Sequence, residues 1–170
     1  LDEAKAGKPI MGICLGMQIA VIEYARNVVG IKDANSGEFD EQCKHKVINF
    51  MPGQNDNIDK GGTLRLGAYP CNIQAGTTMH RCYDVDTISE RHRHRYEFNN
   101  DYREQITLSG LTVSGTSPDG RLVETVEITD RPFHVGVQYH PEFKSRPNRP
   151  HPLFKGFIQA ALSHQSGGNL

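Results

Sequence analysis

The chain has 170 residues, a net charge of −1 and 36% hydrophobic residues, which is typical of one globular domain. No apolar run approaches the ~20 residues of a membrane-spanning helix, and no secretory signal pattern opens the chain. The balance of 19 basic against 20 acidic residues argues against a broad nucleic-acid surface. Because the chain starts at Leu1 rather than at a methionine, we expect a piece of a longer cytoplasmic protein.

The four cysteines, Cys14, Cys43, Cys71 and Cys82, include no C-x-x-C pair, which argues against a zinc ribbon or a thioredoxin-like motif. Two disulfide bridges are possible in principle. Without a secretory signal, free thiols in a reducing compartment are the better interpretation. Each cysteine is then either a small buried hydrophobic residue or a reactive group.

The first half of the chain predicts a strand at residues 8–13, a sharp turn at Cys14 and a helix over residues 15–26. Polar and glycine-containing stretches predict loops at 35–40 and 52–62. Residues 46–51 and 63–69 are expected to form strands. The opening strand–turn–helix unit is typical of an α/β protein.

In the second half, Asn100 is expected to cap a short helix over residues 101–108 that Gly110 ends. Residues 111–115, 122–128 and 134–139 predict strands, with a turn at 117–120. A final helix is expected over residues 152–164, with Pro152 in its first turn. We therefore expect an α/β fold with a mixed, largely parallel sheet flanked by helices.

The clearest chemical motif is G-x-C-x-G, formed by Gly12, Cys14 and Gly16 between the first expected strand and helix. A nucleophile on such a turn is exposed at the end of a sheet, and small residues on either side let the turn close. The start of the helix favours the thiolate, and the Leu15 N–H faces a developing oxyanion. The alternative is a buried cysteine in a glycine-flanked turn.

A cysteine nucleophile needs a base, and His140 is the best placed of the eight histidines because it ends an apolar strand. Glu142, two residues later, is able to orient the imidazole through its second nitrogen. Taken alone, His140 is equally a strand-end histidine bonded to a carbonyl, and Glu142 a solvated surface carboxylate.

Two motifs together, residues 9–18 and His140-Pro141-Glu142, resemble the nucleophile turn and His-Pro-Glu motif of class I glutamine amidotransferases. Within that class, the chain is similar to the C-terminal glutaminase domain of CTP synthases from Lys8 to about Gln165. The stretches that carry this similarity are 35–39, 61–67, 90–99, 115–124 and 151–154. The segment from Glu90 to Asn99 is the most specific of them.

The resemblance implies that Cys14 attacks the side-chain amide of glutamine, that His140 transfers the protons and that Glu142 orients His140. It also implies a glutamine site made by Leu15, Gly16, Met17 and Gln18. Glu38 would hold the α-amino group, and Arg95 would hold the α-carboxylate. One anion and one cation suit a zwitterionic substrate, since arginine binds a carboxylate through two parallel hydrogen bonds.

The basic cluster of residues 91–95 has other possible interpretations. It is able to bind phosphates or nucleic acid, or to form a strand with arginines on one face and histidines on the other. His92 and His94 also suggest a metal pair, although no third ligand has an obvious spacing.

The resemblance further implies that residues 1–170 are a single, partial glutaminase domain without its opening strands. A synthetase domain of the same polypeptide would bind ATP, UTP and Mg²⁺, with GTP as an allosteric effector. No P-loop G-x-x-x-x-G-K-[ST] occurs in this sequence. We expect a homo-oligomer in the full enzyme, and weak hydrolysis by residues 1–170 alone. The alternatives are the glutaminase domain of another class I amidotransferase and a non-catalytic binding or regulatory fragment.

Overall fold

The computed structural model describes residues 2, 6–50 and 64–167, so the expected loop at 52–62 lies outside the described residues. A six-stranded sheet has the order β1-β9-β8-β7-β4-β5, and a small sheet has the order β2-β3-β6. The strands of the large sheet are β1 (Ile10–Ile13), β4 (Arg65–Ile73), β5 (Thr87–His94), β7 (Thr112–Thr116), β8 (Val123–Glu127) and β9 (His134–Val137). Those of the small sheet are β2 (Ala34–Ser36), β3 (His45–Asn49) and β6 (Glu97–Phe98).

Four α-helices accompany the sheets in the described part of the chain, α2 (Leu15–Tyr24), α3 (Thr78–Tyr83), α4 (Arg103–Leu108) and α5 (Pro152–Gln165). Helix α2 continues into a π-helical turn at Ala25–Val29. The 3₁₀ turns Asn100–Tyr102 and Pro141–Lys144 precede α4 and follow β9. No helix among these residues is long and apolar enough to cross a membrane.

The mixed α/β architecture is confirmed, but the expectation of a largely parallel sheet is wrong. Among the described strands, only β1 with β9 and β2 with β3 pair in parallel. The other ladders, β4 with β5, β4 with β7, β7 with β8, β8 with β9 and β3 with β6, are antiparallel. Short connections such as the Ser117-Pro118-Asp119-Gly120 turn between β7 and β8 explain this, because parallel neighbours need a long crossover.

Most expected elements are present, with shifted ends. The expected helix begins as the 3₁₀ turn that leads into α4, and this turn is capped by the side chain of Asn99, which accepts from Asp101 N, rather than by the expected Asn100. Strand β4 runs four residues past the expected end, to Ile73, and β2 overlaps the start of the stretch expected to be a loop. Helix α3 was not predicted from the sequence; the Thr77 side chain and both Glu127 carboxylate oxygens accept hydrogen bonds from its first N–H groups.

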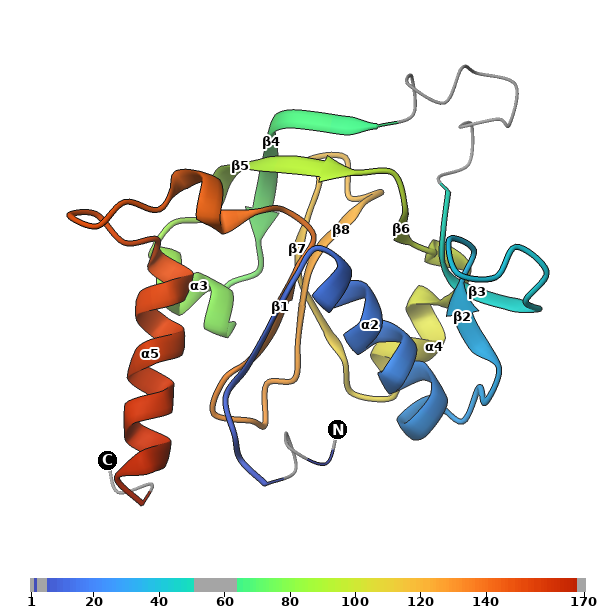
Figure 1. Ribbon diagram of the computed structural model, residues 1–170, viewed down its shortest axis with the longest axis horizontal. Helices are drawn as coiled ribbons and strands as arrows, with labels where there is room; N and C mark the ends of the chain where they lie inside the picture. The colour runs from blue at the N-terminus through green and yellow to red at the C-terminus, as the bar shows by residue number, and fades with distance from the viewer. Residues whose placement is uncertain (1, 3–5, 51–63, 168–170) are drawn as a thin grey trace.

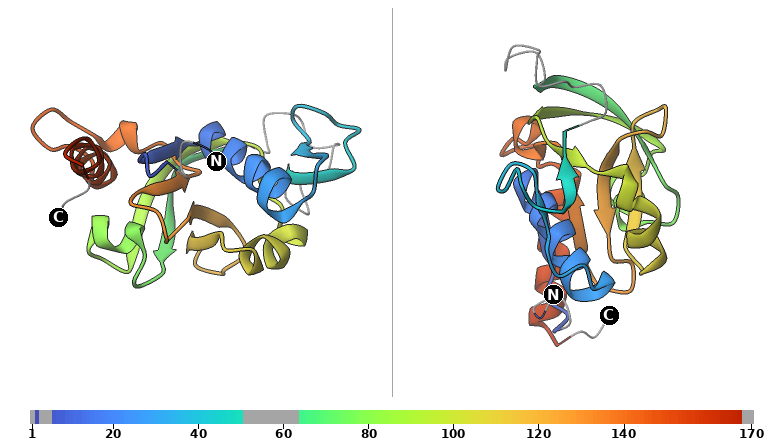
Figure 2. Two further views of the ribbon diagram at one scale, coloured as in Figure 1. Left: turned by 90° about the horizontal axis from the view of Figure 1, so that it is seen from below. Right: turned by 90° about the vertical axis from the view of Figure 1, so that its right-hand side faces the viewer.

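Two hydrophobic cores lie on opposite faces of the large sheet. Helix α2 covers one core, together with the small sheet and α4, and α3 and α5 cover the other (Figure 2). Fully buried Met17 belongs to the first core, and fully buried Tyr139 to the second. Along β9, Val135 and Val137 face the second core, whereas Gly136 faces Met17 of α2, so β9 lies between the two cores.

Two glycines allow α2 to lie close against the ends of β1 and β9. A Cβ on Gly12 would lie 2.7 Å from the Gly16 carbonyl carbon, and one on Gly136 would lie 3.0 Å from Met17 Cγ. The backbone contact at Gly12 leaves no room for any side chain. By contrast, no described atom lies within 4 Å of a Cβ on Gly16, so close packing does not require a glycine there.

The β4–β5 hairpin bends over one end of the large sheet, above the start of α2 (Figure 1). Exposed and buried residues alternate strictly along β5, which confirms the expected separation of arginines from histidines. His94 Nδ1 faces the Tyr96 carbonyl at 3.2 Å and therefore carries the proton. His94 Nε2 then accepts from His92 Nδ1 at 2.9 Å, so both imidazoles are neutral.

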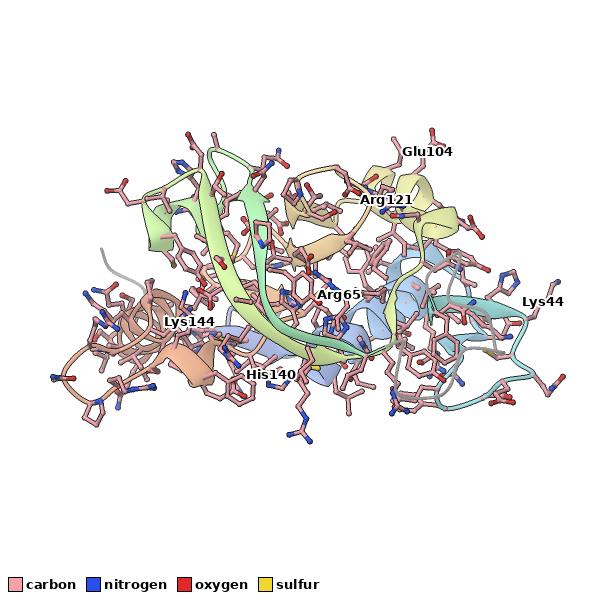
Figure 3. The ribbon with its side chains drawn as sticks, turned by 90° about the horizontal axis from the view of Figure 1, so that it is seen from above. Lys44, Arg65, Glu104, Arg121, His140 and Lys144 are labelled. Atoms are coloured by element: carbon pink, nitrogen blue, oxygen red, sulfur yellow. The ribbon has the colours of Figure 1, made fainter. Side chains whose placement is uncertain are left out.

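Arg65 is the first residue of β4 in this hairpin (Figure 3), and its side chain bonds Glu97 at 3.1 Å and Glu124 at 2.9 Å. Burial and, to a lesser extent, the positive charge of Arg65 lower the pKa values of His92 and His94 to about 2 and about 3. Burial also raises the pKa of Glu97 to about 8, against the opposing effect of Arg65. The neutral forms of these groups therefore stabilise the fold.

These pKa shifts predict maximal stability near pH 6.5. Below that pH, the unfolded state binds protons on His92 and His94 that the folded state does not, so stability falls with decreasing pH. Between pH 6.5 and about 8, folded Glu97 keeps a proton that the unfolded state has lost, so stability falls with rising pH. This second loss is expected to be about 1.4 kcal/mol per pH unit.

Urea unfolding of wild type and Glu97→Gln at pH 6, 7 and 8 measures this contribution. Glutamine keeps an oxygen for Arg65 but has no titrating proton, so the variant should lose the decline above pH 6.5. Equal pH slopes in the two proteins would show that Glu97 is ionised in the folded state.

Candidate active site

Cys14 lies on the turn that joins β1 to α2, with φ 51° and ψ −106°. A positive φ is rare outside glycine; among the other described non-glycine residues only Asp84, at the end of α3, shares it. The turn is held by a hydrogen bond from Cys14 N to the Val137 carbonyl at 2.7 Å and by one from Gln18 N to the Cys14 carbonyl at 3.2 Å. Such strain is typical of a functional residue that its surroundings hold in place.

Burial raises the pKa of the Cys14 thiol above its ordinary value. The Leu15 N–H and the Gln138 side chain lower it, whereas the negative charges of Glu38 and Glu142 raise it. The expectation that the helix start favours the thiolate is therefore only partly realised, because burial has the larger effect. The thiol remains protonated at neutral pH and needs a base in order to react.

His140 follows β9 at the same end of the sheet as Cys14, because β1 and β9 run in parallel with Ile13 opposite Val137. Its Nδ1 bonds Glu142 Oε1 at 2.6 Å, so the proton lies on Nδ1 and Nε2 remains able to accept one. The backbone N–H of His140 donates to the Arg91 carbonyl at 2.8 Å, and the Phe143 ring stacks on the imidazole with the ring centroids 5.0 Å apart. The imidazole is thus oriented on two sides.

A cavity of about 490 Å³ opens at Cys14 beneath the β4–β5 hairpin. Four of the residues predicted to meet substrate line this cavity: Leu15, Gln18, Glu38 and Arg95. The other lining residues besides Cys14 are Leu64, Arg93, His94 and Tyr96. Of the predicted site residues, Met17 is fully buried in the core and Gly16 lines a separate cavity beside Ile19 and Tyr24. His140 and Glu142 are not among the residues that line the Cys14 cavity; they follow β9 at the same end of the sheet as Cys14.

Gln138 is a site residue that was not predicted from the sequence. It is fully buried, and its Nε2 lies 3.6 Å from Cys14 Sγ. The available signal was a single polar residue directly after β9, between the apolar Val137 and Tyr139. Arg93 and Tyr96 also border the cavity, although the sequence did not assign them to the substrate.

The remaining cysteines have no comparable setting. All four thiols are free, and burial raises the pKa of Cys71 to about 12. Cys43 and Cys82 do not line the Cys14 cavity. His92 and His94, the pair with metal-like spacing, are bonded to each other on the buried face of β5.

The family model for class I glutamine amidotransferases matches residues 1–160. The chain belongs to this family. The match includes Cys14 and the His140–Glu142 pair, so both motifs lie inside one family domain. Family membership confirms the resemblance inferred from the sequence.

Curated members of the family include close relatives of this chain. The CTP synthase of Moorella thermoacetica is 58% identical over 95% of the chain, and that of Clostridium perfringens is 61% identical over 93%. In both cases the chain spans 30% of the relative's length.

The chain is more similar to a solved CTP synthase glutaminase domain than to a solved amidotransferase of another kind. The chain matches the Trypanosoma brucei CTPS glutaminase domain with bound acivicin at 40% identity and a TM-score of 0.86, covering 95% of this chain and 62% of that one. A putative GMP synthase protein from Thermoplasma acidophilum shares the fold, with a TM-score of 0.58 over 93% of this chain and 59% of that one, but only 16% identity. The similarity therefore favours the CTP synthase subfamily over the alternative of another class I amidotransferase.

Proposed function

We propose that this chain is the glutamine-hydrolysing part of a CTP synthase, in which it releases ammonia for the conversion of UTP to CTP. One observation carries the proposal: Cys14, on a strained strand-to-helix turn, shares a cavity with Glu38 and Arg95. Glutamine has an amide for the thiol to attack and a zwitterionic head group for the two charges. The similarity to the Trypanosoma brucei CTPS glutaminase domain supports this assignment.

The first step is the attack of Cys14 on the side-chain amide carbon of glutamine. The thiol proton moves to His140 Nε2, and the imidazolium that forms is stabilised by Glu142 at 2.6 Å. The new S–C bond gives a tetrahedral intermediate, whose oxyanion accepts from the Leu15 N–H at the start of α2. Burial, which raises the pKa of the Cys14 thiol, is the reason this step needs a base.

The second step expels the nitrogen. His140 returns its proton to that nitrogen, the C–N bond breaks, and ammonia leaves a glutamyl thioester on Cys14. A water molecule then attacks the thioester carbonyl while His140 accepts a proton. Collapse of this second intermediate breaks the C–S bond, re-forms the Cys14 thiol and releases glutamate.

We assign the binding of ATP, UTP and Mg²⁺ to a synthetase domain of a longer cytoplasmic polypeptide that forms homo-oligomers, as the family resemblance implies. The described part of this chain holds no group of three or more His, Cys, Asp or Glu side chains placed for a metal ion. GTP remains an expected effector, with no residue of this chain assigned to it.

The head-group assignment predicts that Glu38→Ala and Arg95→Ala weaken glutamine use through binding. Each removes one charged hydrogen bond to substrate, which corresponds to about 1.5–3 kcal/mol and a ten- to hundred-fold loss of kcat/KM. The loss should appear mainly in KM. Steady-state glutamate release measures it, in a polypeptide that carries this chain at the length of its curated relatives.

The matched controls are Glu104→Ala and Lys44→Ala, which remove the same charges far from His140 (Figure 3). Both should keep wild-type kinetics. Wild-type kinetics in the Glu38 and Arg95 variants as well would place the amino-acid head group elsewhere and refute the proposed site.

A further inference from the structure

Two buried side-chain amides, those of Gln138 and Gln18, connect Cys14 to the backbone of Tyr96, just after β5. Gln138 Nε2 lies 3.6 Å from Cys14 Sγ, and Gln138 Oε1 accepts from Gln18 Nε2 at 3.1 Å. Gln18 Nε2 also donates to the Tyr96 carbonyl at 3.0 Å. The side chains of Gln18 and Gln138 are 2% and 0% exposed, so protein partners fix their orientation.

The direction of this chain of hydrogen bonds is determined at its far end. The Tyr96 carbonyl only accepts, so the Gln18 atom that faces it must be the amide nitrogen. The same nitrogen faces Gln138, whose oxygen must therefore be on that side. The Gln138 NH₂ group is left pointing at Cys14 Sγ.

We propose that Gln138 is a positioning residue for Cys14. The side-chain amide of Gln138, oriented through Gln18 by the Tyr96 carbonyl, donates to the Cys14 sulfur, holds it in place and stabilises the thiolate form. This inference rests on the proposed function, in which the thiolate attacks glutamine after its proton has moved to His140. A hydrogen bond to an ionised acceptor is about twice as strong as one to a neutral acceptor, so the amide favours the thiolate over the thiol.

The electrostatics of the turn explain why such a donor is needed. Glu38 and Glu142 both place negative charge near Cys14, and burial disfavours the anion further. Two donors act in the opposite direction, the Leu15 N–H and the Gln138 amide. The Leu15 N–H is also assigned to the oxyanion, which leaves Gln138 as the donor dedicated to sulfur.

The test is the pH dependence of Cys14 alkylation by iodoacetamide, a small probe that needs no substrate recognition. Peptide mapping isolates the Cys14 signal from the other three thiols. Gln138→Met removes the donor at similar volume, and the alkylation midpoint should rise by about one to two pH units. Gln138→Glu, nearly isosteric, replaces the donor by a carboxylate and should raise the midpoint at least as far.

The matched control is Thr125→Val, which removes a buried hydrogen bond to Ser114 of 2.8 Å on β8 without touching Cys14. Its alkylation midpoint should equal that of wild type. Unchanged midpoints in both Gln138 variants, with circular dichroism showing a folded protein, would overturn the inference.

Glutamine turnover of the wild-type enzyme is measured separately. A shifted midpoint in an enzyme without turnover would refute the proposed function and leave the bond to sulfur standing. Wild-type turnover together with an unshifted midpoint in the Gln138 variants would refute the role of Gln138 and leave the proposed function standing.

Discussion

Replacing Cys14 by alanine is expected to reduce glutamine-dependent glutamate release by at least about 10³-fold, because no other thiol lies on the strained turn at the cavity. Removal of a nucleophile eliminates the thioester pathway, and the residual rate then reflects only binding and the oxyanion donor. In a polypeptide of the relatives' length, CTP formation from added ammonia should persist, since that reaction bypasses glutamine hydrolysis.

Cys43→Ala is the matched control, because it removes a half-buried free thiol that does not line the Cys14 cavity. It should retain wild-type turnover. A Cys14→Ala enzyme that keeps more than about a tenth of wild-type glutamate release would contradict a thioester at this residue.

Replacing His140 by alanine is expected to have the second-largest effect, a loss of about 10²–10⁴-fold in kcat for glutamine, which is typical of a missing general base. The raised pKa of the Cys14 thiol makes the base necessary near neutral pH. Some activity should therefore return as pH rises and the thiol ionises without help. Glu142→Gln should cost less, because Glu142 orients the imidazole through the 2.6 Å bond and transfers no proton itself.

His164→Ala provides the control, since this exposed histidine lies in the last turn of α5. Its kinetics should be those of wild type. Simultaneous loss of glutamine-driven and ammonia-driven CTP formation in His140→Ala would indicate a damaged fold rather than a missing base.

The strand–turn–helix unit around Cys14 could be predicted from the sequence because its determinants are local. Gly12 tolerates no side chain where α2 returns over β1, and the apolar strand and the helix lie on either side within a few residues. The His140–Glu142 pair is also local, two residues apart. The alternation of exposed arginines and buried histidines along β5 could also be predicted, because successive side chains of any strand point to opposite faces.

Other features depend on contacts between residues far apart in sequence, which a single sequence does not show. Gln138 reaches Cys14 across 124 positions, and its orientation depends on Gln18 and on the Tyr96 carbonyl. The burial of Met17 follows from the way α2 packs on Gly136, not from its place in the motif. The excess of antiparallel pairs reflects short connections that follow β7.

The most direct test of the central claim is covalent labelling by a glutamine chloromethyl ketone, followed by peptide mapping. The ketone carries the substrate head group and therefore alkylates fastest a thiol that meets it in the substrate orientation. We predict rapid modification of Cys14 alone, suppressed by excess glutamine and slowed in Arg95→Ala. Equal modification of Cys43, Cys71 or Cys82, or labelling of Cys14 that glutamine does not suppress, would contradict Cys14 as the nucleophile of a glutamine site.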